Sequence, residues 1–311
     1  MQSETKVLLG RVTIGVLAFL IVGVLAVWYA GGELIAPARH SIGRPPPTFN
    51  VANATFVSGS GSLIQGWLAN GTAGQGVVML LHGVRGDRRD MLSRAEFLNR
   101  LGYSVLMFDF QAHGESRGES ITFGDRESRD VVAAIQYLRH EFPRERIGVV
   151  GVSLGAAAFV LADGRGPVNA VVLESMYPTV QRAVAARLRL HLGPVGPLFA
   201  PLLTVQLHSR LGLDTDRSRP IDRMARIGAP VFILNGTLDK QTPIQDARAL
   251  FAAASAPKQL WAIEGAAHVD LHAFAKADYE RRVAQFLGKY LRQTDMPASP
   301  ADMTEQRQSA W

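Results

Sequence analysis

The sequence contains no cysteine. This absence excludes disulfide bonds, thiolate metal ligands and a cysteine nucleophile. It does not identify a cellular compartment, because a secreted protein can also fold without disulfides. Apolar residues make up 47% of the chain and charged residues 19%, so the chain can build a sizeable hydrophobic core. Its 311 residues allow one large domain with appendages, or two small domains.

The sequence also lacks a basic stripe interleaved with aromatic residues, which is the pattern typical of a nucleic-acid-binding surface. We therefore expect no nucleic-acid partner. The net charge is nevertheless +6 at pH 7. This basic excess is compatible with binding to an anionic membrane surface.

Charged side chains are absent from one stretch of the chain, residues 12–32. A helix needs about 20 apolar residues to cross a bilayer core, and this run is long enough. Lys6 and Arg11 precede the run, while Trp28 and Tyr29 lie at its far end, where interfacial aromatic residues are expected. The sequence therefore predicts a single-pass N-terminal membrane anchor.

Two alternatives to an anchor remain open at this point. A cleaved signal peptide is one, although its apolar core normally spans only about 7–15 residues. Ala36-Pro37-Ala38 resembles a cleavage site. A buried core helix is the other alternative, which the length of the run disfavours. Basic residues flank both ends, so orientation is weakly determined, and we expect a short N-terminal tail with the rest of the chain exported to a periplasmic or extracellular space.

The chain divides into four regions. We expect an N-terminal tail and transmembrane anchor at 1–32, a proline-rich linker at 33–48, a folded domain at 49–293 and a disordered tail at 294–311. The linker contains three consecutive prolines, which favour an extended, semi-rigid spacer. The tail is polar and contains two prolines, a composition typical of disorder.

Apolar strands and helices alternate through the folded domain. Residues 51–69 predict a hairpin with its turn at 58–62. Further strands are expected at 76–81, 104–110, 147–152, 168–174, 231–235 and 259–263. Helices are expected at 90–101, 128–140, directly after residue 153, at 244–254 and at 275–292. This alternation predicts an α/β fold with a mainly parallel sheet that helices cover on both faces.

Residues 177–222 interrupt the alternation with a helical, proline-punctuated insertion. One interpretation is an ordinary helical elaboration that packs on the edge of the sheet. The other is an apolar cap that shapes an acyl pocket, with Arg182, Arg187 and Arg189 on its solvent side. The sequence alone leaves both interpretations open.

The segment Gly151-Val152-Ser153-Leu154-Gly155 joins a β-branched apolar strand to a helix of small residues. This arrangement is typical of a nucleophile elbow, in which a tight turn exposes the serine hydroxyl at the end of the strand. The N–H groups of the following helix would face any negative charge that forms there. We therefore predict that Ser153 is a catalytic nucleophile.

A second segment, Gly114-Glu115-Ser116-Arg117-Gly118, matches the same five-residue pattern. No apolar strand precedes it, and no apolar helix follows it. We therefore interpret Ser116 as a structural loop serine.

A serine nucleophile requires a base and an orienting carboxylate. His268 is the predicted base because it lies in a small-residue loop just after the last strand, and His272 is the alternative. Asp239 is the predicted acid, although a helix N-cap would also explain an aspartate there. Glu174, at the end of the strand after the elbow, is the alternative acid. The order serine, aspartate, histidine along the chain favours Asp239 and His268.

Acyl transfer also requires two N–H donors for the oxyanion. Leu154 follows the nucleophile directly, and its backbone N–H is the first predicted donor. The loop 81–86 follows the first parallel strand, and the backbone N–H of Val84 is the second. We expect His82 to hold this loop without taking part in the chemistry.

Together these motifs resemble the α/β-hydrolase fold superfamily, in the Bem46 and serine-aminopeptidase-like branch of membrane-anchored or soluble serine hydrolases. The residues that carry the resemblance are His82-Gly83, 109–116, 151–155, 236–239 and 265–268. The resemblance implies the catalytic triad Ser153, Asp239 and His268, with Val84 and Leu154 as oxyanion donors. It implies no metal ion and no organic cofactor. One departure is Gln111-Ala112, which replaces the Arg-Gly often found before His113-Gly114.

The sequence therefore predicts a serine hydrolase that cleaves a carboxylic ester or thioester. A lipid-like ester would suit the anchor and the apolar insertion, so the expected partners are such a substrate and a membrane. A serine peptidase of the same fold is an alternative. A catalytically inactive, membrane-bound binding protein is another, which would have no need of the complete set of nucleophile, base, acid and oxyanion loops.

Overall fold

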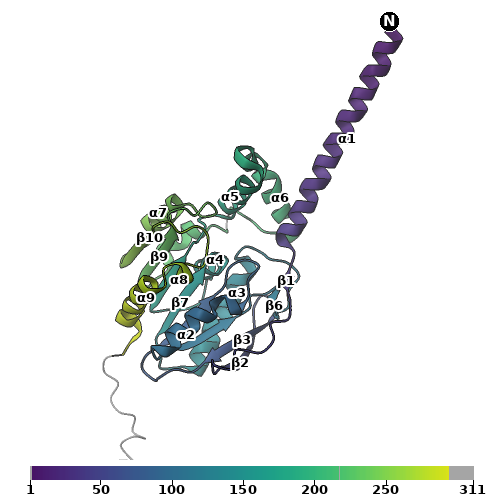
Figure 1. Cartoon of the computed structure of the whole chain (residues 1–311). Helices are drawn as coiled ribbons and strands as arrows, with labels where there is room; N and C mark the ends of the chain where they lie inside the picture. Colours follow the sequence, from purple (N-terminus) through teal and green to yellow (C-terminus); the bar gives the residue numbers. More distant parts are fainter. Residues whose placement is uncertain (1, 217, 294–311) are drawn as a thin grey trace, which may run out of the picture.

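A computed structural model describes residues 2–216 and 218–293 of the chain. The predicted disordered tail, 294–311, lies outside the described residues. Within them, an N-terminal helix precedes an α/β domain with a helical insertion (Figure 1).

The described part of the domain is built on a twisted eight-stranded sheet in the order β10-β9-β8-β7-β4-β5-β3-β2. Its strands are β2 (Ala52–Val57), β3 (Leu63–Ala69), β4 (Val77–Leu81), β5 (Ser104–Phe108), β7 (Ile147–Val152), β8 (Ala170–Glu174), β9 (Val231–Gly236) and β10 (Lys258–Ile263). Strand β3 pairs antiparallel with β2 and with β5, and all other pairs are parallel. Strands β2 and β3 form the expected hairpin. The predicted mainly parallel α/β-hydrolase sheet is therefore confirmed.

Helices cover both faces of this sheet (Figure 1). Apolar residues of α3 (Asp125–Glu141), α4 (Leu154–Leu161) and α7 (Ile244–Ala253) join one buried cluster. Those of α2 (Leu92–Arg100), α8 (Leu271–Phe274) and α9 (Lys276–Leu291) join the cluster on the opposite face. The 3-10 helix η1 (Arg88–Met91) leads into α2.

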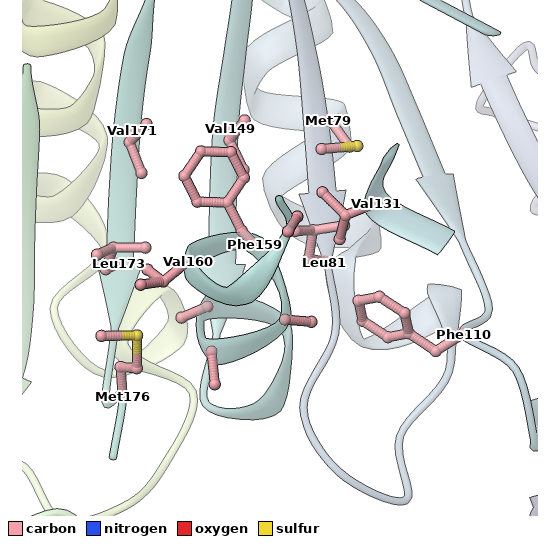
Figure 2. Close-up of a cluster of buried hydrophobic side chains, with 14 of the residues drawn as sticks. Met79, Leu81, Phe110, Val131, Val149, Phe159, Val160, Val171, Leu173 and Met176 are labelled. Carbon is pink, nitrogen blue, oxygen red and sulfur yellow. The ribbon is translucent and has the colours of Figure 1, made fainter. Parts of the chain in front are cut away.

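The two clusters follow from the period of a β-strand, in which successive side chains point to opposite faces. Met79 and Leu81 of β4 lie in the first cluster, whereas Leu80 lies in the second. Figure 2 shows Met79 and Leu81 on the same side as Phe159 and Val160 of α4. All five residues of β4 are buried, which explains why its sequence is a continuous apolar run.

Helix α3 begins earlier than the sequence predicts, at Asp125 instead of residue 128. The carboxylate of Glu127 accepts hydrogen bonds from the Gly124 N–H and the Thr122 hydroxyl. These bonds satisfy donors at the start of the helix, so the helix gains its first turn.

The N-terminal helix α1 (Gln2–Ile35) projects away from the domain (Figure 1). It continues beyond residue 32, which is the predicted end of the anchor. The following segment, predicted as an extended, semi-rigid spacer, is attached to the domain, because β1 (Ala38–Arg39) pairs with β6 (His113–Gly114). Ile42 and Phe49 are also buried in the domain. Strand pairing and apolar burial therefore fasten this linker to the domain.

The insertion forms a separate group of helices between β8 and β9. It consists of α5 (Val180–Leu192), η2 (Gly193–Phe199), α6 (Ala200–Leu211) and η3 (Pro220–Arg226). Helix α6 lies beside the base of α1, at the end of the molecule from which α1 projects (Figure 1). We refer to residues 180–211 as the cap.

Truncation of the central aromatic side chain of this core provides a test of the packing. Phe159 is fully buried between α4 and the sheet (Figure 2). We expect Phe159→Ala to lower the free energy of unfolding by about 3–5 kcal/mol, because it leaves a cavity. The melting temperature of the detergent-solubilised chain should fall by on the order of 10 °C. Val57→Ala, at an exposed strand position, is the control and should change it little. A similar melting temperature for both variants would contradict this account.

Candidate active site

Ser153 forms the turn between strand β7 and helix α4. The strand ends at Val152 and the helix begins at Leu154. The backbone of Ser153 has a φ of 49° and a ψ of −108°, values that residues with a side chain rarely adopt. Its N–H donates a hydrogen bond of 2.8 Å to the Glu174 carbonyl oxygen on β8. The neighbouring strand therefore holds this strained turn in place.

The two glycines of the motif are required by close backbone contacts. A Cβ on Gly151 would lie 2.7 Å from the Ala156 nitrogen, and one on Gly155 would lie 2.5 Å from the Leu81 carbonyl oxygen. Both distances are too short for a side chain. Helix α4 can therefore begin directly against strands β7 and β4 only because both positions are glycine.

The second serine of the same sequence pattern has a different environment. Ser116 is fully buried. Its hydroxyl donates to the Asp109 carbonyl oxygen at 2.7 Å and accepts from the Gln65 N–H at 2.9 Å. These bonds join a loop to strand β3, so Ser116 has the structural role expected of it.

Asp239 and His268 lie together after strands β9 and β10. His268 Nδ1 is 2.7 Å from Asp239 Oδ2. The Thr242 hydroxyl donates to the same carboxylate oxygen, and the N–H groups of Gln241 and Thr242 donate to the other. A Pro243 N-cap begins the next helix, α7, so these contacts do not make Asp239 its N-cap. An Nδ1–H that donates to Asp239 leaves His268 Nε2 on the opposite edge of the ring.

The charge of Asp239 suits this contact. Burial raises the pKa of its carboxyl group, but hydrogen bonds from His268 and Thr242 outweigh burial and hold that pKa below its ordinary value. Asp239 is therefore ionised at neutral pH. A carboxylate in this position orients the imidazole and stabilises a positive charge on it.

The alternative acid and base have other partners. The buried carboxylate of Glu174 accepts hydrogen bonds from Arg94, with Nη2 at 2.7 Å, and from the hydroxyl of Tyr279. The ring of His272 lies 3.0 Å from the Ser93 hydroxyl and 3.0 Å from a carboxylate oxygen of Glu280. The structure therefore brings Asp239, and not Glu174, to His268.

Both predicted oxyanion donors belong to residues that line the pocket at Ser153. Val84 and Leu154 border this pocket together with Ser153 and His268. His82 lies beneath the Val84 loop, with Nδ1 2.7 Å from the Gly83 carbonyl oxygen and Nε2 accepting the Phe110 N–H at 3.1 Å. Burial lowers the pKa of His82 to about 3, so its ring is neutral and can accept this bond. His82 thus links two loops beside the pocket.

The walls of this pocket come from the domain, from the cap and from the end of α1. The remaining lining residues are Leu34, Arg85, Phe123, Tyr177, Ala183, Val184, Arg187, Gln241 and Thr242. Arg187 is exposed, as expected of the solvent side of the insertion, but it also borders the pocket. Its guanidinium reaches back to the Gln241 side chain, at 2.7 Å, and so borders the pocket.

Sequence motifs did not identify several of these walls. Leu34 lies in the region assigned to the linker, and it reaches the pocket because α1 continues to Ile35. Arg85 directly follows Val84 in the oxyanion loop, so its place in that motif is a signal that could have identified it. No local pattern marks Phe123 or Tyr177, because their approach depends on the folding of distant segments.

The chemical capacity of this site is acyl transfer. Such a reaction needs a serine at a helix N-terminus, an imidazole held by a carboxylate and two backbone N–H donors, and Val84 and Leu154 are pocket-lining residues that carry such N–H groups. Among residues 2–216 and 218–293, no group of three or more histidine, aspartate or glutamate side chains is arranged to bind a metal ion.

Substitution of an elbow glycine tests the close contact between α4 and the sheet. We expect Gly155→Ala to lower the free energy of unfolding by about 1–3 kcal/mol, because its Cβ would overlap the backbone of Leu81 and His82. Gly83→Ala is the matched control beside the same pocket, because its Cβ would meet no atom closer than 3.8 Å. Thermal unfolding followed by circular dichroism measures both. Equal melting temperatures for the two variants would refute the steric argument.

Comparison with known proteins agrees with this architecture. Residues 78–285 match the model of a family described as the alpha/beta hydrolase family. An uncharacterized protein of Mycobacterium tuberculosis is 32% identical over 214 residues, which cover 68% of this chain and 69% of that protein. YqkD of Bacillus subtilis is 25% identical over 215 residues, covering 68% of this chain and 70% of its own. The solved structure of the Pyrococcus furiosus esterase Pf2001 has the same fold, with a TM-score of 0.67 and 24% identity, and covers 83% of this chain and 98% of its own.

Proposed function

The chain belongs to the alpha/beta hydrolase family, and from this premise we propose that it is a serine hydrolase that cleaves a carboxylic ester or thioester. The contact of 2.7 Å between Asp239 and His268, on a pocket that Ser153 also lines, is the observation that carries the proposal. We further propose that the chain belongs to the Bem46 and serine-aminopeptidase-like branch of the family.

The proposed reaction proceeds through an acyl-enzyme. Ser153 Oγ attacks the acyl carbonyl while His268 Nε2 takes the hydroxyl proton, and Asp239 balances the charge on the imidazolium. The N–H groups of Val84 and Leu154 stabilise the oxyanion. His268 then gives its proton to the leaving group, and the C–O or C–S bond breaks. Water activated by His268 releases the acid and restores Ser153.

The walls of the pocket support an apolar acyl group as the substrate part held beside Ser153. Leu34, Phe123, Ala183 and Val184 present hydrocarbon to the pocket. Removing an acyl chain from water onto such a surface is favourable by about 0.8 kcal/mol for each buried methylene. A lipid-like ester is therefore the substrate class that we propose.

We also propose that α1 anchors the enzyme in a membrane, with the hydrolase domain on the exported side. The most apolar 18-residue window of residues 10–35 has a mean hydropathy of 2.5, and none of that window is buried in the protein. Membrane-spanning helices and signal sequences share these properties. The contact of Leu34 with the pocket favours retention, because cleavage near Ala38 would remove a wall of the site.

Active-site labelling tests the nucleophile. We expect a fluorophosphonate to form a covalent adduct with Ser153 in the folded chain, because the neighbouring base activates this hydroxyl. Ser153→Ala should abolish the adduct, whereas Ser116→Ala should retain it. Mass spectrometry of the labelled peptides distinguishes the two serines. If no adduct forms on Ser153, the chain is better described as an inactive binding protein with this fold.

Substitution of the two buried acids tests the triad. We expect Asp239→Asn to lower kcat for a p-nitrophenyl ester by roughly 10³–10⁴-fold, because the neutral amide favours the wrong His268 tautomer. Glu174→Gln should retain most of the turnover but lower the melting temperature, because it removes the buried carboxylate partner of Arg94 and leaves only the more exposed Asp270. Steady-state kinetics and thermal unfolding separate these effects. The opposite pattern of turnover would assign the acid to Glu174.

A further inference from the structure

Residues 192–205 of the cap expose six large apolar side chains within a short length of chain. We call this stretch the cap face, and it consists of Leu192, Val195, Leu198, Phe199, Leu202 and Val205. Leu198 has 76% of its surface exposed and Val205 67%. Soluble proteins rarely leave such side chains grouped together in water, so grouped exposure indicates a surface that contacts something apolar.

The cap face is not isolated, because α6 lies along the N-terminal helix. Gln206 Nε2 donates to the Val27 carbonyl oxygen at 3.0 Å. The guanidinium of Arg210 donates to the Trp28 carbonyl oxygen at 2.6 Å and lies 3.8 Å above the centre of the Trp28 ring. These contacts fasten the carboxyl half of α6 to the last turns of α1.

The opposite end of α6 reaches much further along α1. An apolar groove between the two helices is bordered by Phe19, Gly23 and Val24 on α1 and by Phe199 and Leu202 at the start of α6. From Trp28 to Phe19, a helix rises about 14 Å. The cap face therefore lies beside the middle of the uncharged run, not at its end.

This placement constrains any bilayer around α1. A hydrocarbon core is about 30 Å thick, and the uncharged run 12–32 is the part of α1 that fits it. A bilayer centred on this run would reach Phe19, and at that depth it would also meet Phe199 and Leu202. In that bilayer, lipid would surround both α1 and the cap face.

We propose that the cap face inserts into the same membrane leaflet as the last turns of α1, an inference that rests on the proposed membrane anchoring. The occupant of this surface is the acyl region of the bilayer. Charge supports this occupant, because the cap contains neither aspartate nor glutamate, and Arg189 is exposed one turn before Leu192. Arginines at the edge of an inserted apolar face interact favourably with anionic lipid headgroups.

The proposal also specifies how substrate arrives. Leu34 at the end of α1 and Val184 of α5 both border the pocket at Ser153. The two elements that contact the leaflet thus supply walls of the site. A lipid ester held in the leaflet would enter between them with its acyl chain remaining in an apolar environment.

The absence of cysteine makes this placement directly measurable. Single substitutions Leu198→Cys and Val205→Cys introduce one reactive thiol each for a nitroxide spin label, and both positions are exposed. Val16→Cys on α1 reports the anchor, and Val57→Cys, in the hairpin, is the aqueous control with 75% of Val57 exposed. The full chain is reconstituted into vesicles of phosphatidylcholine and phosphatidylglycerol. Relaxation by oxygen, which concentrates in hydrocarbon, is compared with relaxation by a water-soluble nickel chelate.

We expect the ratio of oxygen-induced to nickel-induced spin-label relaxation to be several-fold higher at positions 198 and 205 than at 57. It should be close to the ratio measured at 16. An aqueous ratio at 198 and 205 with a lipid ratio at 16 would overturn the cap inference and leave the anchor intact. Aqueous ratios at 16, 198 and 205 would overturn both. Dipolar broadening between labels at 198 would instead assign the face to a second copy of the chain.

Fluorophosphonate labelling of each variant separates this inference from the proposed catalysis. All four positions lie outside the catalytic residues, so each labelled variant should still form the adduct on Ser153. If the adduct forms on Ser153 but the labels at 198 and 205 give aqueous ratios, only the membrane contact of the cap face is refuted. If the labels at 198 and 205 give lipid ratios but no adduct forms on Ser153, the membrane contact is supported and only the proposed hydrolase activity is refuted.

Discussion

The approach of helix α4 to strand β4 is the constraint on which the site depends. Gly155 meets the Leu81 carbonyl oxygen so closely that no side chain fits between them. This contact brings the Leu154 N–H, at the start of α4, to the loop that carries Val84, because that loop begins where β4 ends. The strained φ of Ser153 is the cost of so short a turn, and the hydrogen bond to Glu174 helps to hold it.

Buried polar contacts distinguish Glu174, an acid with a structural role, from Asp239, the acid that contacts His268. Glu174 lies at the end of the adjacent strand, where a catalytic acid would be plausible from sequence alone. Its carboxylate is occupied by Arg94 and Tyr279, in an environment where an unpaired charge would be unfavourable. Asp239 has three donors from its own turn and faces Nδ1 of His268, so hydrogen bonds stabilise its charge.

Local sequence patterns predicted most of the fold and the polar part of the site. Ser153 was distinguished from Ser116 by its flanking strand and helix, and the alternation of apolar segments predicted the sheet. The patterns could not predict that Leu34 and Arg187 border the pocket, because both depend on how α1 and the cap fold over the domain. The start of α3 was missed for a similar reason, since one side chain, Glu127, adds the first turn.

The location of Leu34 connects α1 to the pocket at Ser153. An anchor needs only to hold a domain near a membrane, and a flexible linker would be sufficient for that purpose. Here β1 pairs with β6 and buried Ile42 and Phe49 remove that flexibility, so the end of α1 has a fixed relation to Ser153. If α1 is the membrane anchor that we propose, that anchor supplies one wall of the pocket, and the surrounding leaflet would help to select the substrate.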